Sequence, residues 1–166
     1  QMSYDLQAGR HVAYQGIPEQ RRLLETYYKS LAGEISALGP QHSLLEAGVG
    51  ETTSLFNILR LMSYRPPIIH GIDLSWSRIR VGSRWFFESG GPGSAKFAVG
   101  SMADMPYADN SFDLVFTSHA IEPNGGRERQ ILSERYRATS RYLLLCAPAY
   151  ELASAKARAR TDQHGY

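Results

Sequence analysis

The stretch Leu44–Leu55, LLEAGVGETTSL, has the pattern of a short apolar strand, a glycine-bearing turn and the start of a helix. Gly48 and Gly50 have no side chains, so a ligand can approach the turn backbone closely and φ can become positive. Residues 52–54 are Thr-Thr-Ser, which can cap a helix whose free amide groups point back at the turn. The stretch therefore predicts a site for a nucleotide-like ligand at the end of a strand.

The glycine spacing and one carboxylate bear on which ligand this is. The dinucleotide fingerprint is G-x-G-x-x-G, and Thr53 stands at its third glycine position. The carboxylate of Glu46 would repel an anionic pyrophosphate, whereas a ligand with a cationic amino acid head would suit it. An ordinary strand–turn–helix without a ligand remains the alternative, because motifs this short also arise by chance.

Composition indicates one soluble globular domain. The chain has 166 residues, of which 43% are hydrophobic and 20% charged, enough for a single core. A net charge of +2 gives no reason to expect nucleic acid or a membrane surface as partner. Cys146 is the only cysteine, which excludes an intrachain disulfide and favours a cytoplasmic protein. Because the chain begins at Gln1, we expect a processed or truncated piece.

Hydrophobic periodicity and Gly/Pro breaks divide this single domain, residues 1–166, into an N-terminal arm with a helix (1–40) and a ligand-binding α/β core (41–166). Residues 1–16 show little periodicity, so we expect a loose arm. The expected helices span about 18–38, 53–64, 75–88, 127–138 and 151–162, and the expected strands about 43–47, 68–72, 96–99, 114–117 and 142–147.

The alternation of strands and helices predicts an α/β fold with a mostly parallel sheet and helices on both faces. In a doubly wound, Rossmann-like sheet of order 3-2-1-4-5, the ligand crevice lies outside the carboxyl ends of the first and fourth strands. The glycine turn lies at such an end. We therefore expect the functional residues to gather there.

Asp73 closes the second expected strand, about 20 residues after the glycine turn, which is the usual distance for a ribose-binding acid. Its carboxylate can accept hydrogen bonds from both ribose hydroxyls. The alternative role is a helix N-cap, but Ser75 can already serve as the cap, so ribose is favoured. Leu74 and Trp76 can flank an adenine ring or pack in the core.

Three stretches in the right order resemble the class I S-adenosylmethionine-dependent methyltransferases, with a domain like methyltransferase type 11. Glu46 with the two glycines resembles motif I, and Asp73 resembles the ribose acid. The stretch 99–124, VGSMADMPYADNSFDLVFTSHAIEPN, resembles the block in which an acid-bearing loop leads through L-P-F to S-F-D and the fourth strand. The resemblance covers residues 44–147 and implies S-adenosylmethionine as cofactor, with S-adenosylhomocysteine as product.

The resemblance also implies which residues contact the cofactor. They are Glu46, Gly48 and Gly50 for the methionine part, Asp73 and Leu74 for the ribose and adenine, Ser101, Met102 and Ala103 for the adenine, and Thr117 beside the methyl group. The family commonly has an aspartate where this chain has Ser101, and Asp104 can compensate. Asp113 is expected to hold the loop by backbone hydrogen bonds.

The resemblance further implies that residues 117–122, just after the fourth strand, line the methyl-bearing side of the pocket. His119 is the candidate base, since imidazole titrates near neutral pH; a packing or cofactor-contacting histidine is the alternative. Glu122 can bind a polar substrate or cap the next helix. An N-P-P-Y motif is absent from residues 117–120, which argues against protein amides and DNA bases as acceptors and favours a small molecule.

Two other functions stay open from the sequence: a non-catalytic cofactor-binding or scaffolding module, and a nicotinamide-dinucleotide-binding domain. Histidines without metal-ligand spacing make a metal site unexpected. The family's last two strands have no counterpart before Tyr166. We therefore expect a fragment, or a substrate side that is open or completed by a partner.

Overall fold

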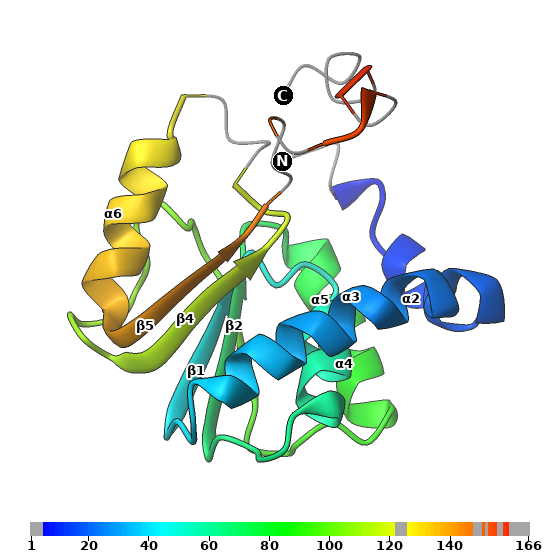
Figure 1. Ribbon diagram of the computed structural model, residues 1–166, viewed down its shortest axis with the longest axis horizontal. Helices are drawn as coiled ribbons and strands as arrows, with labels where there is room; N and C mark the ends of the chain where they lie inside the picture. Colours follow the sequence, from blue (N-terminus) through cyan, green and yellow to red (C-terminus); the bar gives the residue numbers. More distant parts are fainter. Residues whose placement is uncertain (1–4, 122–125, 148–150, 152, 156–157, 160–166) are drawn as a thin grey trace.

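The computed structural model describes residues 5–121, 126–147, 151, 153–155 and 158–159. Its centre is a five-stranded sheet of order β3-β2-β1-β4-β5 in which every pair of neighbours is parallel (Figure 1). The strands are β1 (Ser43–Ala47), β2 (Ile68–Asp73), β3 (Lys96–Val99), β4 (Phe112–Ser118) and β5 (Thr139–Cys146). The predicted order is confirmed, and the sheet is wholly parallel among the described strands.

Helices cover both faces of this sheet, on opposite sides in Figure 1. Three of them, α3 (Pro18–Ala37), α4 (Thr53–Leu61) and α5 (Trp76–Glu88), form one core with alternate strand residues such as Leu44. The other face packs Leu45 and its neighbours against α6 (Glu128–Ala138) and the loop that follows β3. All five residues of β1 are buried, because a central parallel strand is covered from both sides.

Local sequence signals explain where most elements begin. Pro18 occupies the first turn of α3, where its missing N–H costs nothing. Residues 28, 31 and 35 recur at helical spacing and are buried against the sheet. The Ser75 hydroxyl accepts the Arg78 N–H at 3.2 Å, so Ser75 is the N-cap of α5.

Several predicted elements differ from the structure, among them β4, which begins two residues before the expected position 114. Residues 10–15 of the expected loose arm form a helix, α2 (Arg10–Gln15), which packs on α3, α4 and α5. Helix α4 ends at Leu61 rather than Tyr64, because the backbone becomes extended at Met62. Strand β5 starts three residues early, since α6 passes directly into extended backbone at Thr139. The expected helix at 151–162 falls largely outside the described residues.

Asp113 joins the amino ends of β1 and β4, at the end of the sheet opposite the glycine turn. Its Oδ2 accepts the backbone N–H groups of His42 at 2.7 Å and Ser43 at 3.3 Å, and its Oδ1 accepts the Ser140 hydroxyl at 3.3 Å. The predicted structural role of Asp113 is confirmed. In the part of the chain that the structure describes, no helix is long and apolar enough to cross a bilayer.

Candidate functional site

The glycine turn after β1 is held against the end of β2 by its own backbone. The N–H groups of Gly48 and Val49 donate to the Ile72 carbonyl oxygen at 2.8 and 3.0 Å. Gly48 has a φ of 84° and Gly50 a φ of 54°, a region that favours glycine. A Cβ atom on Gly48 would lie 2.3 Å from the Cβ of Ala120. Both the backbone and the space therefore require glycine at position 48.

Asp73 bridges the glycine turn and the start of α5. Its Oδ2 accepts the Gly50 N–H and its Oδ1 accepts the Ser75 N–H, both at 2.9 Å. Each carboxylate oxygen has a second lone pair, so these two bonds leave acceptor capacity on the half-buried group. The side chain of Asp73 is thus fixed in place, and α5 is capped by Ser75 as the sequence suggested.

Glu46 points its carboxylate into the molecule beside this turn. The residue is only 1% exposed, and its Oε2 has no hydrogen-bond partner among the described residues. Burial raises the pKa of the Glu46 carboxyl well above its usual value, and the charge of Asp73 raises it further, while the Leu55 backbone N–H lowers it in part. A buried acceptor without a partner costs free energy, and a cationic ligand group would satisfy it.

The loop after β3 brings Met102 onto the glycine turn. The Met102 Sδ would lie 3.0 Å from a Cβ on Gly48, and it accepts a hydrogen bond from Arg135 Nη2 at 3.0 Å. The Ser101 hydroxyl accepts the Ala103 N–H at 3.1 Å, and the Ala103 carbonyl accepts Gln130 Nε2 at 3.0 Å. The Ser101 hydroxyl and the Ala103 carbonyl therefore stabilise the conformation of this loop.

The carboxyl end of β4 sends its side chains to opposite faces of the sheet. Thr117 is 1% exposed and accepts a hydrogen bond from Nη2 of the buried Arg135, on the α6 side, at 3.3 Å. Ser118 lies on the other face, where its Oγ is 2.7 Å from the Tyr27 hydroxyl of α3. Because of this alternation, the Thr117 side chain is buried between the sheet and α6 and does not lie on an open surface.

His119 follows Ser118 in a left-handed backbone conformation, with a φ of 52°. Its N–H donates to the Cys146 carbonyl at the end of β5 at 2.8 Å. The imidazole is exposed, and its centroid is 5.3 Å from that of the Tyr27 ring. A non-glycine residue with positive φ is uncommon and is often found at functional sites. Burial raises the pKa of the Tyr27 hydroxyl to about 12, so Tyr27 is a neutral hydroxyl at physiological pH.

The N-terminal segment packs over the turns at this edge of the sheet. The Val12 N–H of α2 donates to Glu51 Oε2 at 2.9 Å, and Asp5 hydrogen-bonds the hydroxyl of Ser75. Arg78 lies between these contacts, with its Nε 3.8 Å from Glu51 Oε1. Burial lowers the pKa of His11, which also faces Glu51 and Arg78. The arm thus covers residues that flank the glycine turn.

The structure brings most predicted site residues to one edge of the sheet. Those with contacts that join β1, β2, β4 and the loop after β3 are Glu46, Gly48, Gly50, Asp73, Met102 and Thr117. Leu74 and Trp76 follow Asp73 and are 49% and 58% exposed. Ala103 is buried, so its side chain packs in the core. Glu122 lies outside the described residues.

Sequence reasoning missed Tyr27, Arg78 and Arg135 as neighbours of the site. Tyr27 belongs to the apolar side of its helix, and Arg78 and Arg135 lie in helices that contain other arginines, so the sequence does not say which of these side chains reaches the strand ends. The described residues include no group of His, Cys, Asp and Glu that could hold a metal ion.

Comparison with known proteins now assigns the family. A family model described as a methyltransferase domain matches residues 44–141. The chain belongs to this family, and its fold is that of a class I methyltransferase domain.

Solved structures show the same fold at low sequence identity. Geranyl diphosphate C-methyltransferase from Streptomyces coelicolor A3(2) is similar with a TM-score of 0.67 and 20% identity over 89% of this chain and 54% of that one. A putative S-adenosyl-L-methionine-dependent methyltransferase from Methanococcus maripaludis has a TM-score of 0.64 and 15% identity, over 92% of this chain and 70% of that one. The YcgJ protein from Bacillus subtilis has a TM-score of 0.59 and 20% identity, over 72% of this chain and 50% of that one. The chain thus spans about half the length of several structures that it matches.

Proposed function

We propose that this domain binds S-adenosylmethionine outside the carboxyl ends of β1, β2 and β4, and that it transfers the methyl group to a small-molecule acceptor. The observation that carries the proposal is the buried Glu46 carboxylate beside the glycine turn, whose Oε2 lacks a hydrogen-bond partner within the described part of the chain. The α-ammonium group of the cofactor would neutralise it. A similar structure, geranyl diphosphate C-methyltransferase, contains S-adenosyl-L-homocysteine, which supports this choice of cofactor.

The chain's own residues fit the rest of the cofactor. Gly48 and Gly50 leave the turn backbone open to the methionine part, which any side chain at position 48 would obstruct. Asp73 is oriented by two backbone N–H groups and retains lone pairs for the ribose hydroxyls. The exposed Leu74 and Trp76 side chains supply apolar surface for the adenine.

Direct methyl transfer asks the protein mainly to position the acceptor and exclude water. When bound, the cofactor supplies an electrophilic methyl group on a sulfonium sulfur. The Ser118–His119 end of β4, held by Tyr27, is where we place the acceptor. His119 would take the proton of an acceptor O–H or N–H group. The missing N-P-P-Y motif at residues 117–120 and the small net charge support a small-molecule acceptor.

Two further proposals concern the cellular compartment of the protein and its substrate side. The lone cysteine favours the cytoplasm. A partner, or further chain beyond Tyr166, would complete the substrate side next to β5.

A non-catalytic, cofactor-binding or scaffolding module is the second candidate. The observation that favours it is the Ser101 hydroxyl, which is bonded to the Ala103 N–H where the family commonly has an acid. A nicotinamide-dinucleotide-binding domain is disfavoured, since Thr53 replaces the third glycine and the Glu46 carboxylate would repel a pyrophosphate.

Calorimetric titration with S-adenosylhomocysteine tests the proposal. Asp73→Ala should weaken binding by roughly ten- to a hundredfold, because it removes a doubly hydrogen-bonded partner. Glu88→Gln, an exposed carboxylate on the same α5 helix, is the matched control and should bind like the wild type. Binding of NAD in place of S-adenosylhomocysteine would refute the cofactor. Cofactor binding without methylation of any member of an acceptor library would favour the scaffolding module.

A further inference from the structure

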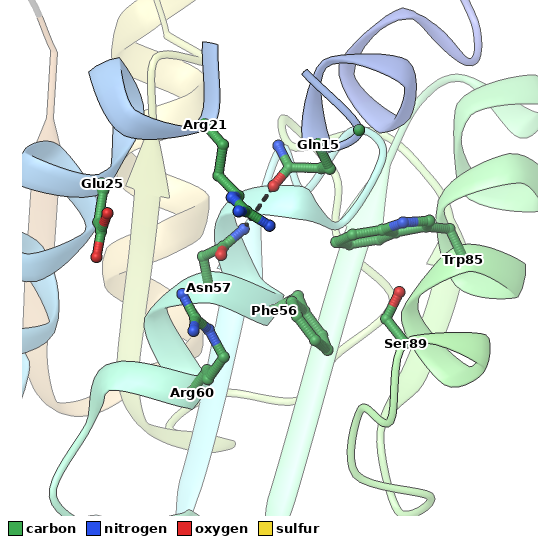
Figure 2. Close-up of a pocket in the computed structure, with 9 residues that line it drawn as sticks. Gln15, Arg21, Glu25, Phe56, Asn57, Arg60, Trp85 and Ser89 are labelled. Atoms are coloured by element: carbon green, nitrogen blue, oxygen red, sulfur yellow. Dashed lines mark hydrogen bonds between the residues drawn. The ribbon is translucent and has the colours of Figure 1, made fainter. Parts of the chain in front are cut away.

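A cavity of about 520 Å³ lies among the helices and shares no residue with the proposed cofactor site. It is formed by the junction between α2 and α3 and by the outer sides of α3, α4 and α5 (Figure 2). A concave site with a few convergent polar groups is the usual form of a small-molecule site. Nothing in the methyl-transfer reaction requires it.

One wall of this cavity is aromatic. Phe56 of α4 and Trp85 of α5 meet edge to face, with ring centroids 4.9 Å apart and planes at 66°. Both side chains are only half-buried, so part of each ring faces the cavity. A planar aromatic ligand can pack there in the offset or edge-to-face geometries that aromatic groups prefer.

The opposite wall is cationic. Arg21 of α3 and Arg60 of α4 both line the cavity, and Figure 2 shows their guanidinium groups around Asn57, apart from the two rings. Neither guanidinium makes a hydrogen bond or a close ion pair with any described residue, although, after the hydrogen bond and charge of Lys29, the charges of both help to lower the pKa of the Glu25 carboxyl. Glu25, the acid in the lining, is 2.9 Å from Lys29 Nζ. The wall therefore presents two guanidinium forks of the shape that binds carboxylate or phosphate.

The floor of the cavity is fixed before any ligand arrives. Asn57 is 4% exposed, and its Nδ2 donates to Gln15 Oε1 at 3.0 Å and to the Thr53 carbonyl at 2.8 Å. These bonds connect the end of α2 to α4 and so fix the positions of the cavity walls relative to each other. A preformed site loses less entropy on binding.

We propose that this cavity binds a small planar aromatic anion, an aryl carboxylate or aryl phosphate. Its ring would pack on Phe56 and Trp85, while its anionic group would lie between the Arg21 and Arg60 guanidinium groups. The site is independent of methyl transfer and of the residues at the carboxyl edge of the sheet.

Amide NMR spectra of the whole chain test the proposal with 2-naphthoate and 2-naphthyl phosphate as probes. The chain has two tryptophans, and the Trp85→Phe variant assigns their indole N–H signals. We expect the Trp85 signal to shift saturably with at least one probe while the Trp76 signal stays in place. The neutral 2-naphthamide should bind about tenfold more weakly or not at all, because it lacks the charge.

Arg21→Gln and Arg60→Gln should each weaken the charged probe by about tenfold. Both side chains are exposed, so the rest of the spectrum should show an intact fold. Arg80→Gln is the matched control, because Arg80 is an exposed α5 arginine over the Trp76 ring, 5.1 Å from its centroid. Saturable binding that Arg80→Gln leaves unchanged supports the site. No saturable shift at Trp85, or equal affinities in all three arginine variants, would overturn it, and comparison of the two probes distinguishes carboxylate from phosphate.

Discussion

Folding moves the carboxyl group of Glu46 out of water and leaves one of its oxygens without a hydrogen-bond partner among the residues that the structure describes. Such a group is tolerated in native proteins where a ligand supplies the missing interaction. The pKa of Glu46 is raised because burial and the neighbouring Asp73 both disfavour the charged form, so ionising this carboxyl costs free energy in the folded domain. The residue that weakens the free domain is therefore the one that we expect to favour the cationic cofactor.

Glu46→Gln should stabilise the free domain at high pH, by about 1–3 kcal/mol, because it removes a buried charge without a partner. The pKa of Glu46 is higher in the folded state than its ordinary value of 4.5, so wild-type stability is full below about 4.5 and falls as pH rises through the folded-state pKa. The difference in unfolding free energy between variant and wild type should shrink as pH is lowered toward 4.5. Urea unfolding at several pH values measures it, and a gap that does not change with pH would contradict the prediction.

Gly48→Ala should destabilise the domain more than Gly90→Ala does. The two glycines have similar φ values, 84° and 86°, so backbone strain is matched at about 1 kcal/mol or more. Only Gly48 has a neighbour, Ala120 Cβ, 2.3 Å from the added atom, whereas Gly90 has nothing within 4 Å. The difference in unfolding free energy isolates the steric cost of the turn. Equal losses would mean that the turn can move aside.

At the scale of elements, the decisive contact joins α3 to the end of β4. The Tyr27 hydroxyl and Ser118 Oγ are 2.7 Å apart although they are far apart in sequence. The Tyr27 ring also lies beside His119. Because the residue that follows β4, His119, has a positive φ, a contact from a neighbouring helix helps to hold this strand end in place.

A double-mutant cycle of Tyr27→Phe and Ser118→Ala tests that contact. Each single change should cost about 0.5–1.5 kcal/mol of unfolding free energy, and the double variant should lose less than the sum, because both changes remove the same hydrogen bond. Additive losses would show that the two hydroxyl groups do not interact. If the bond positions the acceptor, Tyr27→Phe should also reduce turnover while binding of S-adenosylhomocysteine is unchanged.

At the scale of the whole molecule, the cofactor site exists only when β1, β2, β4 and the loop after β3 meet at one edge of the sheet. Ligand binding should therefore stabilise the folded domain as a unit. At a concentration 100 times its Kd, S-adenosylhomocysteine should add about 2.7 kcal/mol to the unfolding free energy. At the same ligand concentration Asp73→Ala should keep only about 0.4–1.4 kcal/mol of this gain, because its Kd is roughly ten- to a hundredfold higher. Urea unfolding with and without ligand measures it, and an equal gain in both proteins would place the ligand elsewhere.

The sheet order was expected only because the alternation of strands and helices is typical of doubly wound folds. The sequence by itself determined the alternation of elements and the glycine turn. These follow from local chemistry: hydrophobic periods, a proline at the start of α3, a serine cap on α5, and glycines where φ is positive. Asp73 was identified by its distance from the turn, and Asp113 was correctly assigned a structural role. The family resemblance rests on the same short-range patterns.

Only the tertiary structure decided what surrounds these motifs. Residues 10–15 have weak helical periodicity, and α2 forms where it packs on α3, α4 and α5. The unpartnered oxygen of Glu46, the contact of Tyr27 with Ser118, and the cavity between Arg21 and Trp85 all depend on residues distant in sequence. The physical reason is that helix and strand patterns act over a few residues, whereas burial, hydrogen-bond partners and cavities depend on which elements pack together.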